Sequence, residues 1–176
     1  SGDDGALVVA EVGWSGNDWR KLAAGAWVYT ADFTPLAAPD GPEDDGNEGW
    51  YAIADRTVWR GESATMAAFL RIGQAEERYN PFDGYIGFGT SLAGFSSRRP
   101  ADELGLAVAI GLTGDGFEAS RRLDGLPTDN HETTIELTYR APVTDWLTLQ
   151  PDIQYIVNPG NDPALEAAPT AAGPSR

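Results

Sequence analysis

Residues 103–112 read Glu-Leu-Gly-Leu-Ala-Val-Ala-Ile-Gly-Leu. Every even-numbered position of this stretch carries a large apolar side chain, and every odd-numbered position after Glu103 carries Gly or Ala. Successive side chains of a β-strand point to opposite faces of the sheet, so this alternation predicts a strand with two different faces. An amphipathic helix would instead repeat its apolar residues every three or four positions.

The same period of two recurs along the chain. In 131–140 the apolar Ile135, Leu137 and Tyr139 alternate with Glu, Thr and Arg, and 147–157 alternates in the same sense. Weaker alternation occurs at 5–14, 19–30, 49–60, 65–74 and 84–95. The sequence therefore predicts an all-β chain with eight strands of about 10 to 12 residues each.

The connections between these segments alternate in length. Short links are expected at 15–18, 61–64, 96–102 and 141–145, and long polar links at 31–48, 75–83, 113–130 and after 158. This layout indicates an antiparallel up-and-down meander with all its long loops at one end. Transmembrane β-barrels have this layout, and their strands need about 9 to 11 residues to cross a bilayer.

Large aromatic residues lie beside the short links. They are Trp14, Trp19, Trp59, Tyr139 and Trp146. A ring of aromatic side chains at one end of the strands is typical of the membrane–water interface of a β-barrel. The alternative interpretation is that these rings close the end of a soluble core.

Composition excludes several classes of protein. The chain has 12 Lys and Arg against 27 Asp and Glu, for a net charge of −15, which argues against nucleic acid as a partner. Cysteine is absent, so thiolate metal sites, disulfides and cysteine nucleophiles are excluded. No stretch contains the roughly 18 to 20 consecutive apolar residues of a spanning helix.

Several motifs carry a family resemblance. The longest is Trp146-Leu-Thr-Leu-Gln-Pro-Asp-Ile-Gln-Tyr-Ile-Val-Asn-Pro-Gly160, preceded by Glu136-Leu-Thr-Tyr-Arg140. Shorter matches occur in the same order at Gly25-Ala-Trp-Val-Tyr-Thr30, Gly49-Trp-Tyr51, Phe69-Leu-Arg71 and Arg98-Arg-Pro-Ala-Asp102. Together they resemble the carbohydrate-selective porins of the OprB type over about residues 20–157.

The resemblance implies an outer-membrane barrel of about 16 strands, either trimeric or monomeric. It implies passive diffusion of sugars through a water-filled barrel, contact with outer-membrane lipid, and neither catalysis nor a cofactor. Residues 1–157 would form the C-terminal part of the barrel. Residues 158–176 are expected to be a flexible Pro/Ala-rich tail without a strand pattern, where such porins have a closing strand. A fragment is therefore expected.

The lumen of a large barrel is polar, so the alternation nominates residues that face it. The charged and amide candidates are Glu11, Lys21, Arg56, Arg60, Arg71, Glu132, Glu136, Arg140, Gln150, Asp152 and Gln154. The aromatic candidates are Trp27, Tyr29, Trp50 and Phe69, whose rings would stack on the apolar face of a sugar. The alternative is that the charges only solvate the lumen and pair with one another across strands.

Other groups of residues give weaker indications of a functional site. The acidic residues Asp40, Glu43, Asp44, Asp45 and Glu48 lie in a Gly/Pro-rich loop, where carboxylates could hold Ca²⁺, but their spacing is not that of an EF-hand and favours a solvated loop. His131 is the single histidine and is a poor basis for a catalytic triad. A glycosidase would need two carboxylates about 5 to 9 Å apart, and their separation does not follow from the sequence.

The main alternative to a porin is a soluble, secreted, lectin-like β-sandwich. In a sandwich, the apolar faces of the strands meet each other in a core, whereas in a porin they point outward. Leu104, Leu106, Val108 and Ile110 distinguish the two architectures by the face they occupy.

Overall fold

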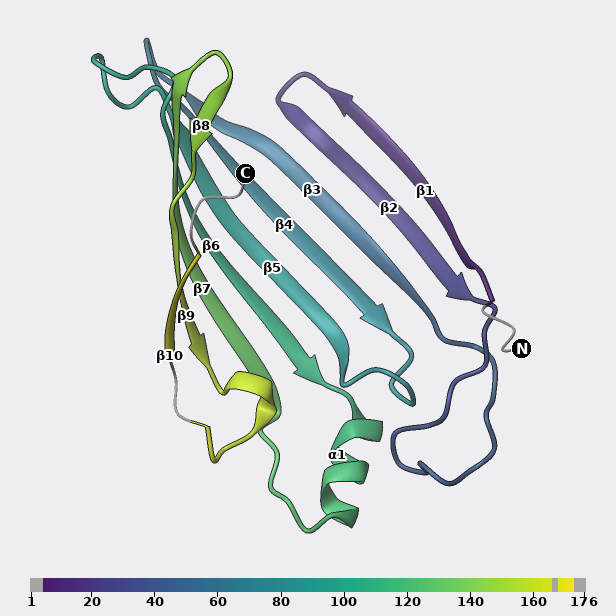
Figure 1. The fold of residues 1–176 in the computed structure, drawn as a ribbon. Helices are drawn as coiled ribbons and strands as arrows, with labels where there is room; N and C mark the ends of the chain where they lie inside the picture. The colour runs from purple at the N-terminus through teal and green to yellow at the C-terminus, as the bar shows by residue number, and fades with distance from the viewer. Residues whose placement is uncertain (1–4, 166–167, 173–176) are drawn as a thin grey trace.

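The computed structural model describes residues 5–165 and 168–172, and its strands form one curved antiparallel sheet (Figure 1). The strands are β1 (Leu7–Gly16), β2 (Trp19–Tyr29), β3 (Glu48–Arg60), β4 (Thr65–Ala75), β5 (Phe82–Ala93), β6 (Glu103–Thr113), β7 (His131–Thr144), β8 (Leu147–Leu149), β9 (Asp152–Val157) and β10 (Ala168–Ala172). The helices are α1 (Asp115–Leu123) and the 3-10 turn η1 (Pro159–Asn161). From β1 to β7 each strand pairs with the next, β9 and β10 follow, and β8 pairs with the end of β7.

The expected all-β meander is confirmed. Each of the eight predicted strands has a counterpart in the sheet. The expected alternation of link lengths is wrong in the middle of the sheet, where the link between β4 and β5 has 6 residues and the link between β5 and β6 has 9. The segment 147–157 is divided into β8 and β9, because Pro151 has no N–H to donate to a strand ladder. The Pro151 carbonyl instead accepts the N–H of Tyr139 at 3.0 Å.

Strand register separates the sheet into two faces. One cross-strand row consists of Leu70, Phe88, Val108, Ile135 and Tyr155, and the neighbouring rows on that face are also largely apolar. We call this the outer face. We call the other the concave face, because its side chains from β2 to β7 line a single groove of about 610 Å³.

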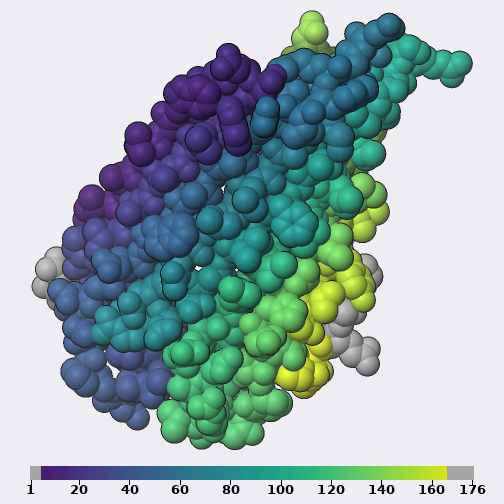
Figure 2. Space-filling model, turned by 180° about the vertical axis from the view of Figure 1, so that it is seen from behind, coloured from purple at the N-terminus to yellow at the C-terminus, as the bar shows by residue number. Residues whose placement is uncertain are grey.

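The outer face is not covered by a second layer. Leu106 is 51% exposed, and the buried apolar residues within the described segments are limited to Ala23, Ala67, Tyr79 and Ala141. Figure 2 shows the sheet from behind as a continuous surface on which the strands lie side by side. The sandwich alternative is therefore wrong, because its core would need a second sheet facing these side chains.

The expected aromatic residues gather at the short-link end. Register places Trp14, Trp19, Trp59 and Tyr139 on the outer face near the ends of their strands. Trp146 lies in the turn between β7 and β8 and is 83% exposed. An exposed ring of this kind favours an interfacial girdle over the plug of a soluble core.

A buried carboxylate stabilises the link between β5 and β6. Asp102 is 1% exposed, and its Oδ2 accepts hydrogen bonds from Arg99 Nε at 2.6 Å and from the Tyr139 hydroxyl. These bonds, first that of Arg99, hold the pKa of Asp102 below its usual range. The carbonyl of Asp102 also accepts the N–H of Gly94 at 3.2 Å, which closes the link between β5 and β6.

Two elements at the long-link end differ from the expectation of plain loops. The link after β6 contains α1, which has Asp115 and Glu118 in its first turn and Arg121 and Arg122 in its last. Acidic side chains at the start of a helix and basic side chains at its end stabilise it, because they offset the partial charges of the helix dipole. Arg121 also pairs with Asp162 at 2.9 Å, which fixes the helix to the segment after η1.

The segment after residue 157 contains structure that the sequence pattern did not predict. η1 follows β9 directly, and β10 pairs antiparallel with β9 from Ala168 to Ala172. The expectation of no strand there is wrong for these residues, because backbone pairing to the free edge of β9 needs no apolar alternation. Residues 166–167 and 173–176 of the expected tail lie outside the described residues, and the flexibility of the tail stays a prediction.

Candidate functional site on the concave face

Most of the predicted lumen residues share the concave face. Register places Glu11, Lys21, Trp27, Tyr29, Arg60, Phe69, Arg71, Glu132, Glu136, Arg140, Asp152 and Gln154 there. One row crosses the sheet in the order Lys21, Asp55, Phe69, Gly89, Ala107, Glu136 and Gln154. The structure thus brings charged, amide and aromatic groups from β1 to β9 onto one wall.

Three of the predicted residues are not on this wall. Trp50 pairs with Ala26 and Gln74 on the outer face, and Tyr51 takes the concave position instead. Both residues are aromatic, so the alternation did not distinguish which of them points inward. Arg56 is also on the outer face, where its guanidinium lies 5.4 Å from the centre of the Trp19 ring. Gln150 lies between β8 and β9, outside the strands.

The outer position of Arg56 has a physical reason. It lies near the short-link end of β3, at the level of Trp19 rather than in the middle of the apolar rows. An Arg at this level can pack its methylene stem on an aromatic ring while its charge reaches the aqueous boundary. Alternation reports which residues share a face, but it does not distinguish a lumenal charge from an interfacial one.

Several charges of the concave face are paired with each other. Lys21 Nζ lies 3.0 Å from Glu11 Oε1, and the hydroxyl of Tyr51 donates to Glu11 Oε2 at 2.9 Å. Glu136 accepts a hydrogen bond from Gln154 Nε2 at 2.7 Å. Cross-strand pairing of this kind was the alternative to sugar contact, and it holds for these members of the set.

Two further charges have partners outside the strands. Arg60 pairs with Asp18 in the turn between β1 and β2. Glu132 accepts the backbone N–H of Gly160 at 2.5 Å, which attaches η1 to the wall. Arg71 differs from these residues, because it forms no ion pair with any residue in the described segments, and its guanidinium lies 5.1 Å from the centre of the Phe69 ring.

The groove on the concave face also contains three aromatic residues that the sequence analysis missed. Tyr51, Phe82 and Tyr85 line it together with Trp27, Arg71 and Glu132. In 49–60 the alternation was weak, and in 84–95 only Ile86, Phe88 and Leu92 were read as a face. The glycines near Tyr85, at positions 84 and 87, could have indicated that its ring lies on the concave face, because small residues leave room for a ring.

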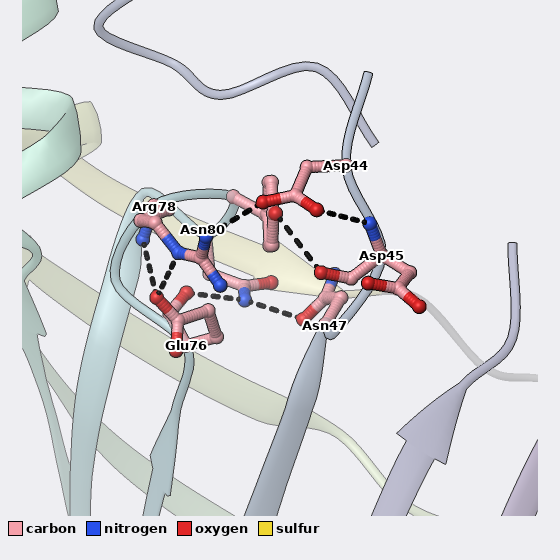
Figure 3. A network of polar contacts seen from close by, with 7 residues as sticks. Asp44, Asp45, Asn47, Glu76, Arg78 and Asn80 are labelled. Carbon is pink, nitrogen blue, oxygen red and sulfur yellow. Dashed lines mark hydrogen bonds and ion pairs between the residues drawn. The ribbon is translucent and has the colours of Figure 1, made fainter. Parts of the chain in front are cut away.

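The acidic loop between β2 and β3 is fastened to the link between β4 and β5 (Figure 3). Arg78 joins the two segments, with Nη1 3.0 Å from Asp44 Oδ2 and Nε 2.7 Å from Glu76 Oε1. Asn80 Nδ2 donates to Asn47 Oδ1 at 2.9 Å. The carboxylate of Asp44 therefore has a guanidinium partner, and no group of three acidic or histidine side chains gathers around a common point within the described residues.

An aromatic chain continues from this loop into the groove. Trp27, Tyr29, Phe33 and Tyr79 follow one another with ring centres 5.6 to 5.8 Å apart. Tyr79 is buried, and its hydroxyl donates to the Asp45 carbonyl at 3.2 Å. The loop thus rests on aromatic contacts as well as on the polar network.

Replacing Arg78 with Gln is expected to expose the acidic loop to proteolysis. The substitution removes both ion pairs that link Asp44 and Glu76 and the cation–π contact of Arg78 with Tyr79, while the contacts between aromatic rings remain. Cleavage after Glu43 by a glutamate-specific protease should become several-fold faster, since local opening limits cleavage in anchored loops. The control is Arg98→Gln at the other end of the sheet. Equal cleavage rates in the two variants would contradict an anchoring role for Arg78.

The family of the chain follows from comparison with known proteins. The model of the carbohydrate-selective porin family OprB matches residues 1–172. The chain belongs to the OprB family. It is 27% identical to Porin B of Pseudomonas aeruginosa over 192 aligned residues, which cover 91% of this chain. The high-pH structure of Pseudomonas putida OprB superposes with a TM-score of 0.83 at 23% identity and covers 96% of this chain.

The chain spans less than half the length of these relatives. It corresponds to 42% of Porin B and to 47% of the P. putida OprB chain. OprB porins are channels of the outer membrane rather than enzymes, so membership places this chain there and confirms the non-enzymatic interpretation. No helix among the described residues is long and apolar enough to span a membrane.

Proposed function

We propose that the full-length protein lets sugars diffuse passively across the outer membrane through a lumen lined by the concave face. The observation that carries the proposal is the division of the sheet into an exposed apolar outer face and a wall with charged, amide and aromatic groups. Family membership supports the same function. Lipid contacts the apolar face, and water and sugar contact the wall.

The wall has the chemistry that this function needs. A sugar offers hydroxyl groups that donate and accept hydrogen bonds, and carboxylates and guanidinium groups complement both roles. Glu11 and Lys21 neutralise each other across two strands, and Glu136 accepts a hydrogen bond from Gln154, so this part of the wall is polar with a weak net field. Passive diffusion requires only such weak contacts, since a tightly held solute would not leave.

Liposome swelling with the purified full-length protein tests this proposal. Vesicles containing the protein should swell in isotonic glucose much faster than vesicles without protein, and a large polysaccharide should give no swelling. A heat-denatured sample of the same preparation is the control for leakage. A glucose rate equal to that of empty vesicles would overturn the proposed function.

A further inference from the structure

One row of the concave face is built almost entirely from tyrosine and glycine. From β1 to β7 the residues directly opposite one another are Glu11, Gly25, Tyr51, Gly73, Tyr85, Gly111 and Glu132. Glycine alternates with a larger residue at every step, and a carboxylate stands at each end. Because neighbouring members are 12 to 26 positions apart in sequence, only the register brings them into one line.

The two tyrosine rings leave the middle glycine uncovered. Tyr51 leans over Gly25, where a Cβ would be 2.5 Å from the ring, and is held there by Glu11. Tyr85 leans along its own strand over Gly87, where a Cβ would be 2.5 Å from the hydroxyl. The three atoms nearest to a Cβ on Gly73 would be the Trp50 carbonyl oxygen at 3.0 Å and the Tyr51 Cβ and Cα at 3.5 and 3.7 Å, and none of them belongs to a ring. The backbone of Gly73 therefore forms the floor of a trough between two rings.

Tyr51, Gly73 and Tyr85 all line the groove of about 610 Å³ on the concave face. That volume falls in the usual range for small-molecule sites, which are mostly apolar with a few placed polar groups. Arg71 lies on the neighbouring row, Glu132 ends the row of Gly73, and Asp83 also lines the groove. One guanidinium and two carboxylates give the groove a formal negative charge, which disfavours an anionic ligand.

These features fit a neutral sugar ring. A pyranose has an apolar face of C–H groups that packs on aromatic rings, and a rim of hydroxyls that needs both donors and acceptors. Tyr51 and Tyr85 offer the rings, Arg71 offers donors, and Glu132 offers an acceptor. The bare floor at Gly73 gives the ligand the depth that any side chain would occupy.

We propose that the trough between Tyr51 and Tyr85, with Gly73 as its floor, is a binding site for a single neutral pyranose in transit. The proposal rests on the proposed function and makes it specific, because it assigns the sugar a place on the wall. It also assigns Gly73 a role in selectivity, although glycine contributes no functional group.

The test is block of ion current by D-glucose in planar bilayers containing the full-length protein. Gly73→Val should weaken the apparent affinity for glucose at least about tenfold and leave the conductance without sugar close to wild type. Gly105→Val is the matched control, because Gly105 lies on the same face, away from the groove, and its Cβ would find its nearest neighbours at 3.8 Å. D-glucuronate should block more weakly than D-glucose in the wild type.

A second pair of variants tests the aromatic rings of the trough instead of filling its floor. Tyr85→Ala should also weaken glucose block about tenfold, whereas Tyr155→Ala on the outer face should not. This pair decides the matter if Gly73→Val does not fold. Unchanged glucose affinity in the folded groove variants, with glucose permeation intact, overturns the site and leaves the proposed function standing. Absence of glucose permeation in the wild type overturns both.

Discussion

Replacing Val108 with Arg is expected to destabilise the folded protein in a bilayer by about 2 to 4 kcal/mol. Val108 is the central residue of β6 and lies on the outer face between Phe88 and Ile135. A guanidinium there must enter hydrocarbon without a partner, or distort the bilayer to reach water. The measurement is a urea titration of the protein folded into phospholipid vesicles.

The neighbouring residue is the control. Ala107 lies on the concave face directly opposite Glu136, so an Arg there meets water and a carboxylate. Ala107→Arg should change the free energy of unfolding by well under half as much as Val108→Arg. If both variants are destabilised equally, the assignment of the two faces to lipid and lumen is wrong.

Replacing Gly94 with Ala is expected to cost about 3 kcal/mol or more of folding free energy. Gly94 has a φ of +70°, and the added Cβ would collide with the backbone carbonyl oxygen of Ser63 in the neighbouring short link. A backbone atom cannot move aside as a flexible side chain does. The two short links would therefore have to separate, which also strains the hydrogen bond from Gly94 to Asp102.

Gly125→Ala separates the two causes of this effect. Gly125 has a nearly identical φ of +69°, but its Cβ would meet nothing within 4 Å. It should cost only the roughly 1 to 2 kcal/mol of placing Ala in the left-handed region. Thermal unfolding and urea titration of both variants measure the difference. A Gly94→Ala cost no larger than that of Gly125→Ala would falsify the steric argument.

The alternation of residues along the sequence predicted the strands and their two faces wherever the side chains on the two faces differ strongly. In 103–112 large residues alternate with Gly and Ala, so chain geometry alone places Leu104, Leu106 and Val108 on one face. Pattern was insufficient where adjacent residues are alike. Trp50 and Tyr51 are both large aromatics, and which of them points inward depends on pairing with β2 and β4.

The sequence pattern did not predict contacts between segments that are distant in the chain. Asp44 was counted as one charge of a solvated loop, yet it pairs with Arg78, 34 positions later in the chain. Asp102 was part of a short turn motif, yet it is buried and accepts a hydrogen bond from Tyr139 of β7, 37 positions later in the chain. Such pairs depend on which links meet at each end of the sheet.

The sequence by itself determined the all-β class, the strand positions and the family, because these reside in local periodicity and contiguous motifs. The tertiary structure decided the lateral order of side chains on the wall. The row from Glu11 to Glu132 takes one residue from each of seven strands. A shift of one residue in any pairing would send part of that row to the outer face, so the trough at Gly73 exists only once every register is set.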